Sequence, residues 1–157
     1  MKKFELTNEF ITNSYGVKLF RIKALIEFGN VKAGDLGGYI EKEENLSHMG
    51  DAWIYGDAQI SGNAQVFGDA QVFGNAWVFG DARVSGDKDY AYAHGFGSCN
   101  RTTTFFRLKD GDVGVRCGCF YGTLAQFRDK VCETHGETKK AQEYLMLADL
   151  MKLRFEK

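Results

Sequence analysis

A six-residue repeat is the feature that most constrains the fold of this chain. From Gly50 to Ser85 the sequence consists of six consecutive hexads, GDAWIY, GDAQIS, GNAQVF, GDAQVF, GNAWVF and GDARVS. Each hexad has Gly first, Asp or Asn second, Ala third, and Ile or Val fifth. This period matches neither a helix nor the alternation of a plain strand. It predicts a prism with short strands as faces, Gly and Asn/Asp at tight corners, and Ala and Ile/Val pointing inward.

These hexads resemble the repeats of left-handed parallel β-helices, in which three hexads make one coil. The resemblance implies two regular coils. Ile40 and Leu46 are also six residues apart, and the longer step from Leu46 to Ile54 indicates a two-residue insertion near Ser47-His48-Met49. The solenoid is therefore expected to have about three coils, with both of its ends capped.

Outward-facing aromatic side chains occupy the same hexads. Residues 18 apart stack on one face of such a prism, which places Tyr55 over Phe73. Burial of a large aromatic side chain stabilises by about 1.5–3 kcal/mol, so we expect these rings to be covered by another subunit or by the chain's own ends. Known left-handed β-helices are commonly trimers, and the resemblance implies a homotrimer here. The expected oligomer interface comprises Trp53, Tyr55, Phe67, Phe73, Trp77 and Phe79.

The segments on either side of the repeat predict two further parts. Residues 1–30 contain two alternating stretches around a turn at Asn13-Ser14-Tyr15-Gly16, which predicts an N-terminal β-hairpin cap. Residues 31–87 hold the β-helix, and residues 88–157 predict a C-terminal α+β module. The expected fold is mostly β: a short left-handed parallel β-helix with a β-hairpin cap and a module of one hairpin and two helices.

A hairpin opens the C-terminal module. Asp110-Gly111 predicts a two-residue turn between strands at 102–109 and 112–120. That register pairs Phe106 with Val115 and Thr104 with Cys117 on an inward face. The opposite face then collects Arg101, Thr103, Phe105, Arg107, Arg116 and Phe120.

Two helices are expected after this hairpin. Thr123 should cap a helix that ends at Gly136. A second helix should start near Glu137. The residues expected to be buried are Leu124, Phe127 and Val131 in the first helix, and Ala141, Tyr144, Leu145, Ala148 and Met151 in the second.

The arginine-bearing hairpin face is the main candidate for a binding site. Arg presents a planar fork to phosphate, Thr adds a hydroxyl donor, and Phe offers a surface on which a base can stack. The loop before it, rich in small and hydroxyl residues, adds donors for an anion. The candidate ligand-binding residues are Ser98, Asn100, Arg101, Thr102, Thr103, Thr104, Phe105, Arg107, Arg116 and Phe120. The alternative is that helices or a neighbouring subunit cover this face and that its arginines pair with Asp and Glu.

A zinc site is a weaker interpretation. Cys117, Cys119, Cys132 and His135 are residue types that bind zinc, but the C-x-C spacing is unusual for such a site. Buried cysteines that behave as small apolar residues are favoured instead. The start of the chain lacks the apolar core of a secretory signal, so the thiols are expected to be reduced in a cytoplasmic protein.

Catalysis is a second alternative. Acyltransferases of the hexapeptide-repeat class resemble this chain in their repeats, and they typically use a His in the groove between subunits. The six hexads contain no His, and His48 and His94 flank them. The sequence therefore indicates no catalytic residue and no cofactor, and an acyltransferase-like enzyme would have to use His48 or His94.

The chain as a whole resembles a group of small phage- and prophage-encoded hexapeptide-repeat proteins. The shared features are VKAGDLGGYIE from Val31, ENLS from Glu44, the repeats, TTTFF from Thr102, RCGCF from Arg116 and THG from Thr134. This resemblance implies a fold and provides no catalytic residue.

A net charge of -1 argues against a general nucleic-acid or membrane-surface binder. Phages also make small oligomeric proteins that trap nucleotide second messengers of bacterial immunity. By analogy of context and site chemistry, the sequence predicts a non-catalytic homotrimer that sequesters a phosphate-bearing small molecule in the bacterial cytoplasm, with such a messenger as the candidate ligand. The remaining alternative is a scaffold that binds a host protein.

Overall fold

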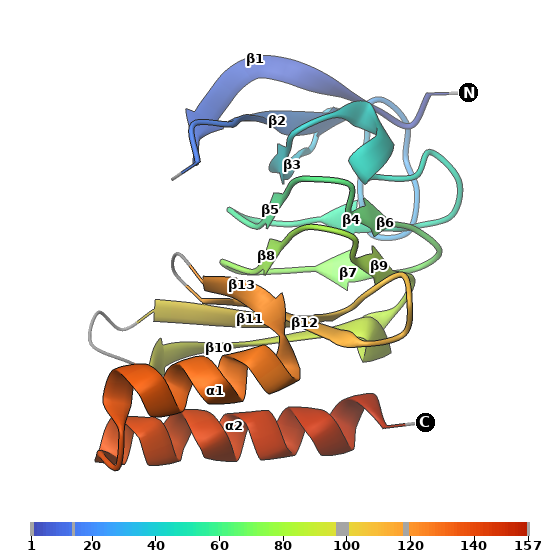
Figure 1. The fold of residues 1–157 in the computed structure, drawn as a ribbon. Coiled ribbons are helices and arrows are strands. Elements are labelled where there is room, and N and C mark those ends of the chain that lie inside the picture. Colours follow the sequence, from blue (N-terminus) through green and yellow to red (C-terminus); the bar gives the residue numbers. More distant parts are fainter. Residues whose placement is uncertain (1, 14, 97–100, 118–119, 157) are drawn as a thin grey trace.

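The computed structural model describes residues 2–13, 15–96, 101–117 and 120–156. Strands from the N-terminal segment lie at one end of the molecule, a stack of very short strands forms the middle, and a second sheet with two helices lies at the other end (Figure 1). The protein is mostly β, as predicted. Of the helices within the described residues, none is long and apolar enough to cross a membrane.

The N-terminal segment forms the predicted hairpin. β1 (Phe4–Thr12) pairs antiparallel with β2 (Lys18–Ala24), and β2 pairs antiparallel with β3 (Leu36–Ile40). At the turn, the Asn13 side-chain oxygen accepts hydrogen bonds from the backbone N–H groups of Tyr15 and Val17. β3 also pairs in parallel with β5 (Gln59–Ile60) of the middle stack, so the hairpin and the stack share one sheet.

The hexads form the middle stack, called the coil below. Each contributes one two-residue strand: β4 (Trp53–Ile54), β5 (Gln59–Ile60), β6 (Gln65–Val66), β7 (Gln71–Val72), β8 (Trp77–Val78) and β9 (Arg83–Val84). β4 pairs in parallel with β7, β5 with β8, and β6 with β9. Partners are 18 residues apart, so three hexads complete one turn, as the period predicted.

The predicted two-residue insertion is also present. Ile40 pairs with Ile60, and Leu46 forms a bridge to Val66, so both of these contacts span 20 residues. The extra residues lie between Leu46 and the first complete hexad, near His48.

The interior of the coil contains the residues predicted to point inward. The Ala and Ile/Val of every hexad are at most 1% exposed. The glycine that opens each hexad has a positive φ of 60 to 75°, the backbone region in which other residues are strained. Successive turns approach closely at these corners. A Cβ added to Gly50 would lie only 2.5 Å from the carbonyl oxygen of Gly68.

The C-terminal module is an antiparallel sheet covered by helices. Its strands are β10 (Tyr90–Phe96), β11 (Arg101–Arg107), β12 (Val113–Cys117) and β13 (Phe120–Thr123), in that order. Helices α1 (Leu124–His135) and α2 (Lys139–Phe155) follow. Phe106 packs in the core of the coil, whereas Phe105 packs with the two helices, so the sheet lies between them (Figure 1).

The predicted register of the β11–β12 hairpin is wrong by one residue. Phe105 pairs with Val115, and Thr104 with Arg116, in place of Phe106 with Val115 and Thr104 with Cys117. The Leu108 N–H donates to the Asp112 carbonyl (2.8 Å), so the loop has three residues rather than two. A one-residue change in register moves each side chain of a strand to the other face of the sheet.

Both helices follow the prediction closely. The Thr123 hydroxyl caps α1 by accepting a hydrogen bond from the Gln126 N–H, and Gly136 ends the helix with φ 57°. α2 begins at Lys139, two residues later than expected, because Thr138 is its capping residue. The predicted buried residues are buried except Leu145, which is half-buried.

Candidate functional site

The predicted arginine face does not exist as one surface. Arg116 lies on the coil side of the sheet and is only 2% exposed. Its guanidinium carbon is 4.7 Å from the ring centroids of Trp77 and Phe79. Arg107 lies on the helix side, where it forms an ion pair with Asp89 (3.1 Å) and donates to the carbonyl of Phe155. The one-residue shift in register therefore separates these two arginines.

The ion pair of Arg107 belongs to the structure of the module. Burial alone would raise the pKa of the Asp89 carboxyl, but hydrogen bonds from Ser85 and Arg107 and the Arg107 charge lower it below its ordinary value. Asp89 is therefore ionised at neutral pH and holds the guanidinium near Phe155. This agrees with the alternative interpretation, in which an arginine of the hairpin pairs with Asp.

The other described members of the predicted site are also engaged within the fold. The Thr103 hydroxyl donates to the Cys117 sulfur (3.2 Å), and the Thr104 hydroxyl accepts from the Trp77 N–H (2.9 Å). Phe105 is buried in the module core, with Phe120 packed against that core. Thr102 contacts a ring nitrogen of His94. Ser98 and Asn100 lie outside the described residues, and Arg101 is described by its backbone alone, at the start of β11.

The residues considered for zinc are not assembled in the described part of the chain. Cys117 is buried beside the hydroxyl of Tyr144 (3.7 Å), whereas Cys132 is exposed on α1. His135 packs its ring against Tyr144. Within the described residues no three His, Cys, Asp or Glu side chains form a metal-binding group, and Cys119 lies outside those residues.

His48 fastens the N-terminal segment to the insertion. Its Nδ1 accepts the backbone N–H of Lys3 (3.0 Å), and its Nε2 lies 3.2 Å from the Glu43 carboxylate. The ring stacks on Phe4 with 4.3 Å between centroids. Both ring nitrogens thus have partners within the chain. His94, on β10, is exposed.

The chain's own ends cover half of the aromatic residues assigned to an oligomer interface. Trp53 is 1% exposed because Phe4 and Phe28 pack against it. Trp77 and Phe79 lie under Arg116. The other three members stay at the surface: Phe73 is 47% exposed and stacks on the half-buried Tyr55 (4.5 Å between centroids), and Phe67 is 38% exposed.

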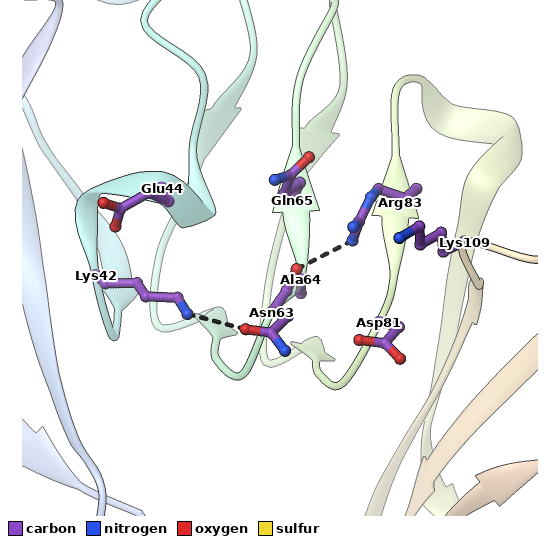
Figure 2. Close-up of a pocket in the computed structure, with 8 residues that line it drawn as sticks. All are labelled: Lys42, Glu44, Asn63, Ala64, Gln65, Asp81, Arg83 and Lys109. Atoms are coloured by element: carbon purple, nitrogen blue, oxygen red, sulfur yellow. Dashed lines mark hydrogen bonds between the residues drawn. The ribbon is translucent and has the colours of Figure 1, made fainter.

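A groove on the β6–β9 side of the coil was not predicted, and it gathers several charged side chains (Figure 2). We call it the cationic groove; its volume is about 320 Å³. Figure 2 shows Lys42 and Arg83 reaching toward Asn63 from opposite sides, with Lys109 beside Arg83. The groove is lined by Lys42, Glu44, Asn63, Ala64, Gln65, Asp81, Arg83 and Lys109.

The fold explains why these distant residues meet. Gln65 and Arg83 both occupy the fourth, outward-facing position of a hexad and are paired across β6 and β9. The hairpin loop after β11 reaches the coil because the Lys109 N–H donates to the Asp81 carbonyl (2.9 Å). Lys42, which follows β3, spans the other side by donating from Nζ to the Asn63 side-chain oxygen (3.0 Å).

The charges of the cationic groove are only partly balanced. Glu44 and Asp81 line it together with the three cations. Among the described residues, however, no carboxylate lies within ion-pair distance of Lys42, Arg83 or Lys109. Arg83 donates instead to the backbone carbonyls of Asn63 and Ala82 (both 3.0 Å). Three cations and two carboxylates thus line the groove, which leaves an excess of one positive charge.

One signal in the sequence pointed toward this groove. The fourth position of the six hexads reads Trp, Gln, Gln, Gln, Trp and Arg, so Arg83 is the single charged residue in that outward column. Comparison with known proteins adds no function to this geometry, since no protein-family model and no curated protein matches the chain.

Proposed function

We propose that this protein is a non-catalytic binding protein that holds a phosphate-bearing small molecule in the cationic groove. The observation that carries the proposal is the meeting of Lys42, Arg83 and Lys109, from three separate segments, in one groove of ligand size. Arg offers a planar fork to phosphate and Lys a compact charge, and hydrogen bonds to a charged group are the stronger kind.

The composition of the groove favours a small ligand over a nucleic acid. Glu44 and Asp81 would repel an extended polyanion, and the chain as a whole carries a net charge of -1. A single phosphate can approach the three cations, while hydroxyl or amino groups of the same molecule donate to the two carboxylates. Such a ligand fits sequestration in the cytoplasm of a bacterial host, which was the role expected from the sequence.

We further propose that the coil is a left-handed parallel β-helix that assembles as a homotrimer. The 18-residue parallel pairing and the positive-φ glycines support the first statement. The hairpin cap and the C-terminal sheet cover the ends of the coil, so subunits would associate through its sides (Figure 1). The stacked rings of Tyr55 and Phe73 provide an apolar edge for that contact.

The proposal includes no catalysis, and the hydrogen bonds that His48 makes within the chain support this part of it. A general base needs an accessible nitrogen near its substrate. Nδ1 of His48 already accepts a backbone N–H, and Nε2 faces Glu43. An acyltransferase-like enzyme would therefore have to break the contacts that fasten the N-terminal segment, or rely on His94.

Native mass spectrometry and titration calorimetry test the proposal with inorganic pyrophosphate and a panel of linear and cyclic nucleotides. We expect at least one of these probes to bind once per chain and to be released unchanged. Arg83→Gln and Lys109→Gln should each weaken binding about 10- to 100-fold, because a hydrogen bond to a charged group contributes about 1.5–3 kcal/mol.

The matched control is Lys140→Gln, which removes the same charge from an exposed position on α2. Its affinity should equal that of the wild type. Failure of every phosphate probe to bind, or equal losses in Arg83→Gln and Lys140→Gln, would contradict the proposal.

A further inference from the structure

We infer that the cationic groove is the phosphate end of a nucleotide site, and that the adjacent hollow beside Phe67 receives the base. This inference rests on the proposed function and specifies its ligand class. The hollow has a volume of about 420 Å³ and is lined by residues that include Leu46, Ser47, Val66 and Phe67. Gln65 and Glu44 line both depressions, so the two adjoin each other on one side of the coil.

The two parts of this combined site differ in chemical character. All three lysine and arginine side chains lie in the cationic groove. At the hollow, Phe67 is the apolar residue whose side chain is exposed, because Leu46 and Val66 are at most 1% exposed. The engaged pair Glu43 and His48 also lines it. A ligand that fills both depressions must therefore combine an anionic end with a flat end that lies against the Phe67 ring, which a free phosphate or a simple sugar phosphate lacks.

Phe67 is the surface on which a base would stack. It occupies the sixth position of its hexad, and its ring is 38% exposed. Tyr55, at the same position of an earlier hexad, is stacked on Phe73. Phe79, the corresponding residue of a later hexad, packs with Tyr15 and Tyr121. Phe67 instead borders a hollow large enough for a heterocycle, and stacking of one base on an aromatic ring contributes about 1–3 kcal/mol.

The polar residues between the two ends suit a ribose. Glu44 is exposed and lies on the boundary, where its carboxylate can accept hydrogen bonds from sugar hydroxyls, as an acidic residue does in dinucleotide-binding folds. Gln65 offers both an amide donor and an acceptor at the same level.

The length of the site agrees with this arrangement. Asn63 in the cationic groove and Phe67 in the hollow are four residues apart along the same side of the coil. Extended chain rises about 3.3 Å per residue, so the span is at most about 13 Å. That is the scale of one nucleotide, and it exceeds what a phosphate alone would need.

Calorimetric titration with AMP, ribose 5-phosphate, adenosine and inorganic pyrophosphate tests the inference. We expect AMP to bind about 10-fold or more tightly than ribose 5-phosphate, since the base adds a stacking contribution. Phe67→Leu should remove that advantage and leave ribose 5-phosphate and pyrophosphate binding unchanged. Arg83→Gln should weaken all three phosphate-bearing probes. Phe10→Leu is the matched control. Phe10 is also an exposed phenylalanine but lies on β1, outside the coil, so this variant should bind AMP as the wild type does.

The outcomes separate the two proposals. If ribose 5-phosphate binds as tightly as AMP, or if Phe67→Leu and Phe10→Leu bind AMP equally well, the nucleotide assignment is wrong while the phosphate function stands. If AMP, ribose 5-phosphate and pyrophosphate all fail to bind, the nucleotide assignment as argued here is wrong, and failure of the whole panel of linear and cyclic nucleotides as well overturns both proposals. Binding of adenosine as tight as that of AMP would place the affinity in the base alone and contradict the role of the cationic groove.

Discussion

The guanidinium carbon of Arg116 lies 4.7 Å from the ring centroid of Trp77, so a residue of the C-terminal sheet is held directly against the coil. The ring of Tyr15, from the tip of the N-terminal hairpin, approaches the same guanidinium at 4.9 Å. One side chain therefore joins three segments that are far apart in the sequence.

Replacement of Arg116 by Met should lower the free energy of unfolding by about 2 kcal/mol. A desolvated cation–π contact contributes about 2 kcal/mol or more, and the Arg116 guanidinium lies over the rings of Tyr15, Trp77 and Phe79, but part of the gain is offset by the cost of burying the charge. Urea unfolding measures the difference. Arg128→Met is the control, because Arg128 forms a surface ion pair with Asp149, which contributes less than about 1 kcal/mol. Equal losses in the two variants would show that Arg116 has no special role.

The coil was predictable because its information is local and repeated. Each hexad carries its own corner glycine and inward residues, so the pairing of Ile54 with Val72 follows from the period. The C-terminal hairpin was less predictable because its register depends on the loop. Asp110-Gly111 suits either a two-residue or a three-residue loop, and the choice decides on which face Arg116 lies.

Gly111 should be required for the loop that sets this register. Its φ is +91°, and its N–H donates to the Leu108 carbonyl. We expect Gly111→Ala to reduce the free energy of unfolding by about 1–2 kcal/mol, the cost of a left-handed backbone for an L-residue. Gly86→Ala should have almost no effect, since Gly86 has an extended backbone and open space around its Cα. A thermal shift in Gly86→Ala as large as that in Gly111→Ala would contradict this explanation.

The corner glycines of the coil should differ in their tolerance of a side chain. Gly50 and Gly56 both have positive φ, so both variants to Ala carry the backbone strain. A Cβ at Gly50 would also lie 2.5 Å from the Gly68 carbonyl oxygen, whereas at Gly56 the nearest atom is 3.6 Å away. Gly50→Ala should therefore be less stable than Gly56→Ala by about 1 kcal/mol or more, given the usual cost of overpacking. Urea unfolding of the two variants measures the difference. Equal free energies of unfolding would mean that successive turns of the coil can move apart at Gly50, and would contradict the prediction.

The cationic groove could be foreseen only in part. The 18-residue period aligns Gln65 with Arg83, and the sequence shows Arg83 as the one charge in its column. Lys109 joins them through a backbone hydrogen bond between the hairpin loop and Asp81, a tertiary contact that no local pattern encodes. The predicted arginine face failed for the opposite reason, because it depended entirely on a register that the loop changed.

Lys3 should make the stability of the protein depend on pH in the alkaline range. Its side chain is 1% exposed and donates to the carbonyls of Gly50 and Ala52. Burial lowers the pKa of Lys3 from 10.5 to about 8, although the Asp51 charge raises it slightly. Between these values the unfolded chain binds a proton that the folded chain has released, so the free energy of unfolding increases with pH.

Comparison with Lys3→Met isolates this contribution, because other titrating groups cancel in the difference. The stability of the wild type relative to Lys3→Met should increase from pH 7.5 to pH 10.5 and then level off. Urea unfolding at several pH values measures it. A difference that stays constant over this interval would mean that the ammonium group is not desolvated in the folded state.

Phe73 should control the oligomeric state. Its ring is 47% exposed and stacks on Tyr55 along one edge of the coil, and Tyr92 of the C-terminal sheet lies beside the next corner at Gly74. These aromatic side chains extend the apolar edge along the side of the coil, which lateral association of subunits would bury.

Phe73→Ser removes the most exposed ring of the edge, so sedimentation equilibrium should find a trimer for the wild type and smaller species for the variant. Phe10→Ser tests mere loss of exposed apolar surface, since Phe10 is also 47% exposed but lies on the hairpin, and this variant should remain trimeric. A monomeric wild type, or an unchanged mass in Phe73→Ser, would show that this edge is not the interface between subunits.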